Sequence, residues 1–253
     1  MAYSFTDGLA LDIQTRRSTA TLGSCAIDTN CITSWTRNIR RCCALQWQLD
    51  FTSYNVCPTQ SVPIVRSIDG GRRGDLVRWG LIPFFAKGEA GKFLTTNARI
   101  ETVTTSPSYR GPWKRGQRCL QLASGFYEWH TDASGRKAPF HITVVDQPLI
   151  AFASLWDRSV KPDGTMVESC TIITMPANAL MHDIHNTGNN PHRMPAILHR
   201  EDWETWLTGS PDEAMAVLKP YPADLMVAYE VSARVNSPKN NDAKLIEPVP
   251  ARA

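Results

Sequence analysis

The stretch Ser124-Gly125-Phe126-Tyr127-Glu128-Trp129 places a single carboxylate between aromatic side chains. It ends the run Cys119–Trp129, whose apolar and aromatic content is typical of a β-strand. A carboxylate in such surroundings is costly to ionise, so we expect the pKa of Glu128 to be raised. A raised pKa of this kind is typical of a carboxylate that acts as a general acid or base in catalysis. The alternative is that Glu128 lies at a solvated strand edge, as most strand carboxylates do, and has no chemical role.

Short strands dominate the chain beyond this stretch. Turn residues separate the runs, and Asp132–Gly135 and Lys161–Gly164 are predicted hairpin turns. Besides Cys119–Trp129, the predicted strands are Val62–Arg66, Leu76–Trp79, Phe140–Val145, Leu149–Trp156, Cys170–Met175, Ala196–Leu198 and Met226–Ser232.

Helices are few in the sequence pattern. We expect short helices over Asn178–Ile184 and over Glu201–Leu207, the second ended by Gly209. The capping box Ser210-Pro211-Asp212-Glu213 opens a third, to about Leu218. Strands and helices do not alternate as in a doubly wound sheet. The sequence therefore predicts an α+β fold: a single domain with a curved, mostly antiparallel, barrel-like β-sheet core and a few flanking short helices.

Composition limits the class of protein. A chain of 253 residues with 42% hydrophobic residues and eight Trp can bury a real core. It has no run of eighteen apolar residues and no basic start followed by an apolar stretch. We therefore expect no membrane span and no secretory signal.

The cysteines indicate a reducing compartment. Seven is an odd number, and their spacing contains no Cys-x-x-Cys pair. Cys119 and Cys170 lie in apolar runs and are predicted to be buried thiols. We expect a cytoplasmic protein with no disulfide framework, no metal site and no cofactor.

Positive charge is concentrated in one part of the chain, although the net charge is only +3. Between Arg66 and Arg118, basic residues outnumber acidic ones, and aromatic residues are interleaved, among them Trp79, Phe84, Phe85, Tyr109 and Trp113. Cations for phosphates and flat rings for unstacked bases are typical of a groove for single-stranded nucleic acid. The alternative is a solvated face with a few buried Trp.

A series of short motifs accompanies Glu128 in a fixed order. They are Tyr54-Asn55-Val56-Cys57-Pro58-Thr59-Gln60, Arg78-Trp79-Gly80-Leu81-Ile82-Pro83, Thr96-Asn97-Ala98-Arg99-Ile100-Glu101-Thr102, Cys170-Thr171-Ile172-Ile173-Thr174, Asp183-Ile184-His185-Asn186-Thr187, Arg193-Met194-Pro195-Ala196-Ile197-Leu198 and Leu245-Ile246-Glu247-Pro248-Val249. From about Tyr54 to Val249 this series resembles the SRAP family, the SOS response-associated peptidases. The resemblance divides the chain into a poorly matched segment, 1–50, and an SRAP-like domain, 51–250.

The resemblance implies a function in the DNA damage response. SRAP proteins sense abasic sites in single-stranded DNA through an N-terminal cysteine that is exposed when Met is removed. Its amine and thiol attack the C1′ aldehyde of the sugar, giving first a Schiff base and then a stable thiazolidine crosslink. Self-processing peptidase activity is associated with the same site. The implied protein is a monomer without a cofactor, nucleoid-associated when bound to DNA.

The family's site residues carry over by motif. Asn97 matches the amide that orients the N-terminal residue, Glu128 the proton-shuttling carboxylate, and His185 the histidine that acts on the opened sugar. His192, just before Arg193-Met194-Pro195, is a competitor for the role of His185. The implied DNA contacts are Arg99 and Arg193 to phosphates, Thr174 to the backbone, and Pro58, Phe85 and Trp129 to bases. For Phe85 and Trp129, ordinary core packing is the alternative.

Position 2 departs from the family, because Ala2 stands where the resemblance requires cysteine. Three explanations remain open. The chain is a substituted copy that binds DNA without stable crosslinking, it is processed further to expose Cys25, or translation starts elsewhere.

Two other functions compete with abasic-site processing. The first is a single-stranded DNA-binding module without covalent chemistry, which the alanine at position 2 favours. The second is metal-dependent hydrolysis by His182, Asp183, His185 and His192. The spacing of His182 and His185 permits a site on one helical face, but the pattern is not His-Glu-x-x-His. This second alternative is therefore disfavoured.

Overall fold

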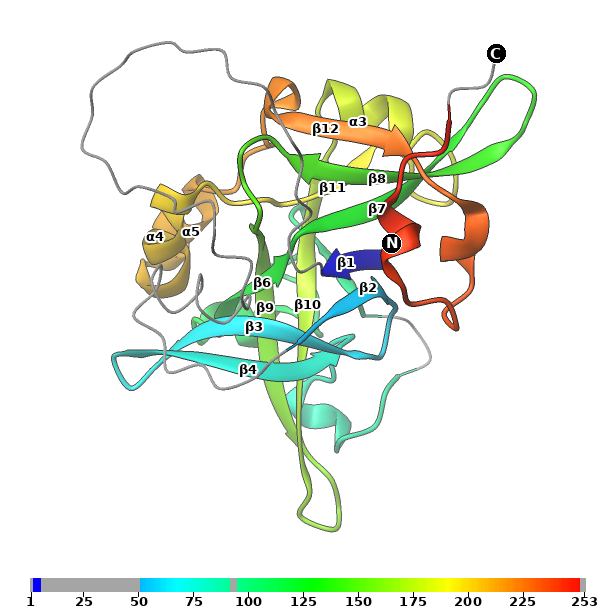
Figure 1. Cartoon of the computed structure of the whole chain (residues 1–253). Helices are drawn as coiled ribbons and strands as arrows, with labels where there is room; N and C mark the ends of the chain where they lie inside the picture. The colour runs from blue at the N-terminus through cyan, green and yellow to red at the C-terminus, as the bar shows by residue number, and fades with distance from the viewer. Residues whose placement is uncertain (1, 6–50, 92–94, 251–253) are drawn as a thin grey trace, which may run out of the picture.

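Five strands close into a barrel in the order β10-β4-β3-β6-β9, with β9 pairing back to β10 (Figure 1). The computed structural model describes residues 51–91 and 95–250 and the backbone of 2–5. The barrel strands are β3 (Ser61–Ile68), β4 (Gly71–Trp79), β6 (Arg118–Ala123), β9 (Ile150–Val160) and β10 (Met166–Pro176). Only the pairing of β4 with β10 is parallel within this ring. The predicted curved, mostly antiparallel core is confirmed.

A second sheet of five antiparallel strands lies against the barrel in the order β12-β8-β7-β1-β2. Its strands are β1 (Ala2–Phe5), β2 (Ser53–Val56), β7 (Gly125–Thr131), β8 (Lys137–Val144) and β12 (Met226–Glu230). Phe126 of this sheet packs edge-on against Phe152 of the barrel, with ring centroids 5.8 Å apart. The two sheets therefore share one hydrophobic core.

The run Cys119–Trp129, predicted as one strand, is two. It bends at Ser124, so that β6 belongs to the barrel and β7 to the second sheet. The bend is invisible to a periodicity argument because nearly every side chain along the run is buried, whichever sheet it faces. Gly125 permits the start of β7, since a Cβ there would stand 2.5 Å from Nε2 of His141 and 2.8 Å from the carbonyl of Ile142.

The helices are short and flank the sheets (Figure 1). They are α2 (Arg110–Lys114), α3 (Ala179–Ile184), α4 (Trp203–Thr208) and α5 (Pro211–Ala216), with 3-10 turns η1 (Phe84–Ala86), η2 (Arg200–Asp202), η3 (Ala223–Leu225), η4 (Ala233–Asn236) and η5 (Ala243–Ile246). Within the described part of the chain, no helix is long and apolar enough to cross a membrane.

The predicted helix signals are largely confirmed. Asn178 caps α3 by accepting from the N–H of Met181, and the capping box of Ser210 and Glu213 opens α5. The helix α5 ends at Ala216, before the predicted Leu218. Gly209 follows α4 with extended backbone, φ −64°, so it ends the helix without the left-handed conformation.

Several short elements differ from expectation. The strands β2 and β5 (Asn97–Arg99) and the helix α2 were not predicted, because elements of three to five residues carry little periodicity. The strand predicted at Ala196–Leu198 is displaced, since β11 covers Arg193–Pro195. Ile197 forms only an isolated bridge, to Phe152. Both predicted hairpin turns are present, joining β7 to β8 and β9 to β10.

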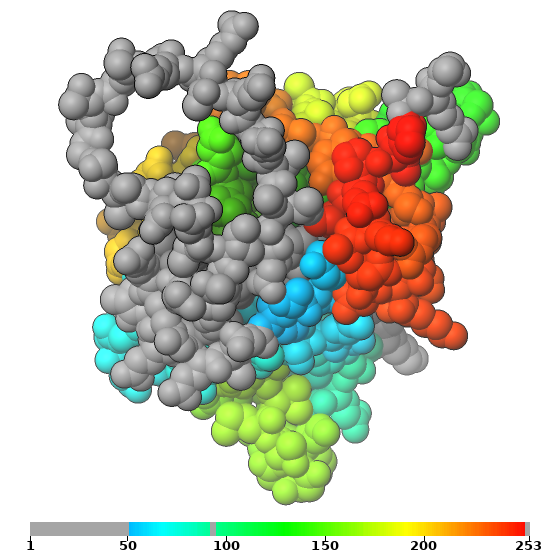
Figure 2. Space-filling view, viewed as in Figure 1, coloured from blue at the N-terminus to red at the C-terminus, as the bar shows by residue number. Residues whose placement is uncertain are grey.

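The segment after β12 returns to cover β2. Nδ2 of Asn55 donates to the carbonyls of Val235, Ser237 and Asn240, each at 3.1 Å. Figure 2 shows this C-terminal segment, in orange and red, directly beside the blue residues of β2. A single amide thus anchors the loop that follows η4 and fixes the edge of the second sheet.

Candidate functional site

Glu128 lies in the middle of β7, opposite Phe140 of β8, and only 4% of it is exposed. The solvated strand edge is therefore the wrong interpretation. Burial raises the pKa of Glu128, while the positive charges of the N-terminal amine, His185 and Lys137 act in the opposite direction. The burial contribution is the larger, so the pKa of Glu128 lies above its ordinary value. The pKa of Glu128 is therefore shifted in the direction that the sequence predicted.

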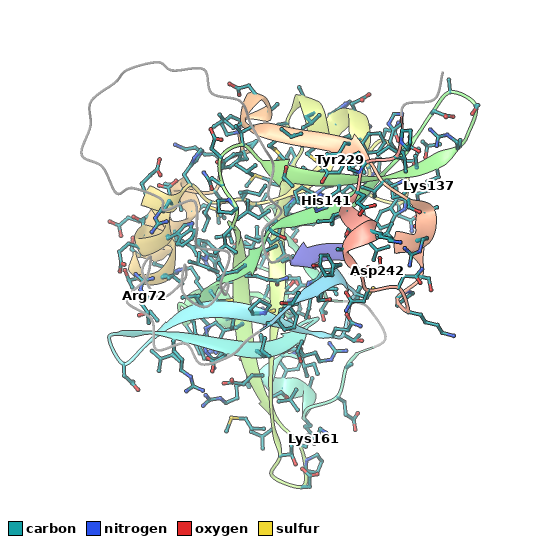
Figure 3. All side chains as sticks on the ribbon, in the orientation of Figure 1. Arg72, Lys137, His141, Lys161, Tyr229 and Asp242 are labelled. Carbon is teal, nitrogen blue, oxygen red and sulfur yellow. The ribbon has the colours of Figure 1, made fainter. Side chains whose placement is uncertain are left out.

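A buried histidine supports the strand that carries Glu128. His141 of β8 places its ring 5.1 Å from that of Tyr127, and its Nδ1 lies 2.9 Å from the hydroxyl of Tyr229 on β12. Figure 3 labels His141 and Tyr229, which face each other on the neighbouring strands β8 and β12. Burial lowers the pKa of His141 to about 4, so the ring is neutral at pH 7. The close approach of this ring explains why residue 125 is glycine.

His185 follows α3, and a nearby backbone carbonyl holds its ring in place. Its Nδ1 lies 3.0 Å from the carbonyl of Arg193. A carbonyl only accepts, so Nδ1 carries the proton and donates. The neutral ring therefore presents an unprotonated Nε2, which can take a proton. A positive charge on His185 lowers the pKa of Glu128, so the two side chains lie within electrostatic reach of each other.

His192 has a different environment. Its ring stacks on that of His182, with centroids 3.8 Å apart, and its Nδ1 lies 3.0 Å from the carbonyl of His182. His192, the alternative to His185, is thus held against α3 by these two contacts with His182. Among residues 51–91 and 95–250, no group of three or more His, Cys, Asp or Glu is arranged to hold a metal ion.

The strand β1 brings the start of the chain to Glu128. Ala2 pairs with Tyr127, and Tyr3 pairs with Phe126 on one side and Val56 on the other (Figure 1). Residue 2 therefore lies beside the strand that carries the buried acid. Cys25 and the rest of the segment 6–50 lie outside the described residues.

Three of the predicted DNA contacts meet near the end of β10. Arg99 of β5 pairs with Thr174 of β10, and Arg193 of β11 pairs with Pro176. Nη2 of Arg193 donates to the carbonyl of Thr174 at 2.7 Å. Asn97 stands two residues before Arg99 on β5, so both exposed side chains point from the same face. The tertiary structure thus collects residues that are up to 96 positions apart in the chain.

The residues predicted to contact bases are not gathered together. Phe85 is 53% exposed on η1, so core packing is the wrong interpretation for it. Trp129 is half-buried, packs against the cluster around Tyr127 and donates from Nε1 to Asn236 at 2.8 Å. Pro58 follows β2 and is partly exposed.

The turn η1 is anchored far along the barrel from the arginines. The N–H of Phe84 donates to Asp157, which pairs with Ser169 of β10. Thr174 lies five residues further along β10, roughly 17 Å at 3.3 Å per residue. Phe85 therefore belongs to a second region of the candidate DNA surface.

Sequence reasoning missed several supporting residues. Glu101 forms a two-pronged ion pair with Arg193, with Nη1 to Oε1 at 2.7 Å and Nη2 to Oε2 at 3.0 Å. It stands in a motif that the sequence displayed, but nothing in that motif indicated its partner. His141 and Asn236 carried no signal, because their importance arises only from strands and loops distant in sequence. The predicted buried thiols, Cys119 and Cys170, are both free and fully buried.

With this geometry described, comparison with known proteins decides the family. The model of the SOS response associated peptidase (SRAP) family matches residues 30–238. The chain belongs to the SRAP family. This match begins twenty residues earlier than the boundary at residue 50 expected from the motifs.

Similar proteins occur in bacteria and vertebrates. "Abasic site processing protein YoqW" of Bacillus subtilis is 42% identical over 198 residues, covering 77% of this chain and 85% of YoqW. "Abasic site processing protein HMCES" of Gallus gallus is 31% identical, covering 78% of this chain and 66% of that protein. A crystal structure of a Bacteroides thetaiotaomicron protein is 33% identical, with a TM-score of 0.69 over 78% of this chain and 85% of its own.

Proposed function

We propose that this SRAP chain binds single-stranded DNA at abasic sites and processes the opened sugar at Glu128 and His185, with Asn97 orienting the start of the chain. One observation carries the proposal: an acid with a raised pKa is buried on β7, the strand that pairs with β1, within electrostatic reach of His185. The names of the similar proteins point to the same substrate. The division into a segment 1–50 and a domain 51–250 remains part of this proposal, as does a monomer that is nucleoid-associated when bound to DNA.

The chemistry follows from the protonation states. An amine at residue 2 attacks the C1′ aldehyde of the abasic sugar, a C–N bond forms, and the carbonyl oxygen leaves as water. Protonated Glu128 supplies the proton that this hydroxyl needs in order to leave. The nitrogen returns a proton to the Glu128 carboxylate as the imine forms, and the free Nε2 of His185 stands as the proton acceptor at the opened sugar. Arg99, Arg193 and Thr174 hold the flanking phosphates, and Pro58, Phe85 and Trp129 contact bases.

Alanine at position 2 limits the product. A thiazolidine needs an amine and a thiol on one residue, so the amine of Ala2 can form only a reversible imine. The second candidate function is therefore a single-stranded DNA-binding module without stable crosslinking. The presence of Ala2 favours it, whereas the buried Glu128 within electrostatic reach of His185 favours the first.

Intact-mass analysis after incubation with abasic single-stranded DNA separates the two functions. We expect no heat-stable adduct from the chain with Met1 removed, and an adduct that survives heating only after borohydride reduction. The variant Ala2→Cys, with Met1 removed, should give a heat-stable adduct without reduction. Intact single-stranded DNA of the same sequence is the control.

The outcomes are distinct. No reduced adduct from the unaltered chain and none from Ala2→Cys would contradict abasic-site processing and leave the binding module. A heat-stable adduct from the unaltered chain would contradict the limit set by Ala2, and sequencing of the N-terminus would then test for a start at Cys25.

A further inference from the structure

The terminal nitrogens of Arg193 are engaged by other groups of the same chain. Its two terminal nitrogens grip both oxygens of Glu101, and Nη2 also donates to the carbonyl of Thr174. Its Nε is buried and has no partner among the described residues. A guanidinium offers its two-pronged face to one anion at a time. The carboxylate of Glu101 therefore takes the place that a phosphate would need on this arginine.

The neighbouring Arg99 has a milder partner. Its Nη2 donates to the side-chain oxygen of Asn190, a neutral amide. The positive charge of Arg99 is thus not neutralised by that contact, and it acts on Glu101 as well, because it helps to lower the pKa of Glu101. The two arginines differ in charge balance: the guanidinium of Arg193 pairs with a carboxylate, whereas that of Arg99 pairs with a neutral amide.

The Glu101 carboxylate is held loosely enough to leave. The side chain of Arg193 is only 16% exposed, whereas that of Glu101 is 47% exposed. Exposed ion pairs contribute little to stability and are screened by salt. Swinging Glu101 into solvent would leave the guanidinium in position, because the carbonyl of Thr174 still holds Nη2.

We propose that Glu101 is a built-in competitor for the phosphate site of Arg193, and that DNA binds there by displacing its carboxylate. The inference rests on the proposed function, since it concerns how the same site meets single-stranded DNA. Glu101 neutralises the guanidinium of Arg193 until a phosphate is positioned to replace its carboxylate. Weakly placed polyanions gain nothing from Arg193, because they must first break the ion pair.

Displacement has a signature in the salt dependence of binding. A cation that neutralises a phosphate of a single strand contributes about 0.7 to the slope of log K against log salt. A lone surface carboxylate condenses no counterion, so the release of Glu101 leaves that contribution in place. Removing the carboxylate should therefore raise the affinity for DNA while the slope stays nearly the same.

The test uses the full chain and an unmodified single strand in a fluorescence titration from 50 to 300 mM salt. We expect Glu101→Gln to bind at least threefold more tightly at 50 mM salt, with little change in the slope of log K against log salt. Asp212→Asn, on α5, removes one exposed negative charge elsewhere and should change neither quantity appreciably. Melting curves of each variant check that the fold is retained.

A charge-conserving variant distinguishes displacement from general repulsion. Glu101→Asp keeps the charge but shortens the side chain, so it should grip the fork less well and bind DNA about twofold more tightly. Unchanged binding by Glu101→Asp, with a gain by Glu101→Gln, would point to plain repulsion and overturn the inference. Weaker binding by Glu101→Gln would make Glu101 a positioning residue and overturn it as well.

Failure of the proposed function has a different appearance. If neither the unaltered chain nor Glu101→Gln binds single-stranded DNA, both the function and the competition are wrong. If the unaltered chain binds and Glu101→Gln is no tighter, only the competition is wrong.

Discussion

Glu128 and Arg66 are both charged residues buried in strands, yet their surroundings are opposite. Arg66 of β3 is fully buried, and each of its nitrogens has an acidic partner: Nε donates to Asp75 at 2.9 Å, and Nη1 and Nη2 donate to Glu168 at 3.1 and 2.6 Å. Its guanidinium also lies over the ring of Trp156, 4.2 Å from the centroid. The charge is balanced on every side.

The carboxylate charge of Glu128 is not balanced by ion pairs in this way. Among the described residues, no Arg, Lys or His forms a direct ion pair with it, and burial outweighs the attraction of more distant charges. A balanced buried charge holds a barrel together, whereas an unbalanced one keeps a proton available. The difference teaches that burial of a charged residue indicates function only when its partners are incomplete.

The largest expected effect is on the balanced site. Arg66→Met removes the cation and leaves Asp75 and Glu168 facing each other without it. We expect a loss of about 3 kcal/mol of unfolding free energy, measured by urea denaturation at pH 7. Arg73→Met, whose side chain is 57% exposed and pairs with Asp75, should cost less than about 1 kcal/mol. Equal losses from the two variants would break the comparison.

A substitution at Glu128 should act mainly on the rate of imine formation. Glu128→Gln keeps the shape of the side chain and removes the transferable proton. Imine formation with abasic DNA should slow by roughly 100-fold, equivalent to about 2.7 kcal/mol of barrier. The affinity for intact single-stranded DNA should be unchanged. Borohydride trapping over time gives the rate, and a variant that loses affinity but not rate would make Glu128 structural.

The pH dependence of stability tests the buried neutral histidine. The pKa of His141 is about 4 in the folded chain, against about 6.5 for a free histidine. Between these values the unfolded chain binds more protons, so stability is complete above pH 6.5 and falls as the pH falls towards 4. We expect a loss of about 2 kcal/mol from pH 7 to pH 5, measured by urea denaturation. His141→Gln should remove most of this dependence.

Glu128 contributes to the same curve with the opposite sign. Its folded pKa is raised, so its contribution to stability is present at low pH and is lost as the pH rises through that pKa. Glu128→Gln removes this opposing contribution. The variant should therefore gain stability more steeply than the unaltered chain between pH 5 and pH 7. A shallower curve would mean that Glu128 is ionised in the folded chain.

The smallest effect is expected at an exposed charge. Arg99→Ala removes one proposed phosphate contact, and because Arg99 is exposed the core is untouched. We expect weaker binding of single-stranded DNA, with the salt slope reduced by about 0.7, and no change in the urea midpoint. Duplex DNA of the same length is the comparison, and equal affinity for both forms would contradict the proposed single-strand groove.

The sequence by itself determined the local features. The apolar runs and turns of β3, β8 and β9, the cap of α3 and the capping box of α5 were all readable, because each depends on neighbours within a few positions. The surroundings of Glu128 indicated a raised pKa because its aromatic neighbours are adjacent in the chain. The ordered motifs indicated the SRAP family and, by resemblance, the candidate site residues.

Only the tertiary structure decided how these pieces combine. It bent one apolar run at Ser124 into two sheets, closed β9 against β10 into a barrel, and placed Ala2 beside Tyr127. It also gave Arg193 its partner Glu101, 92 residues away, and placed His141 beneath Gly125. Such pairings depend on sheet register and on which strands are neighbours. These are set by burial of the whole core, a quantity that no short stretch of sequence contains.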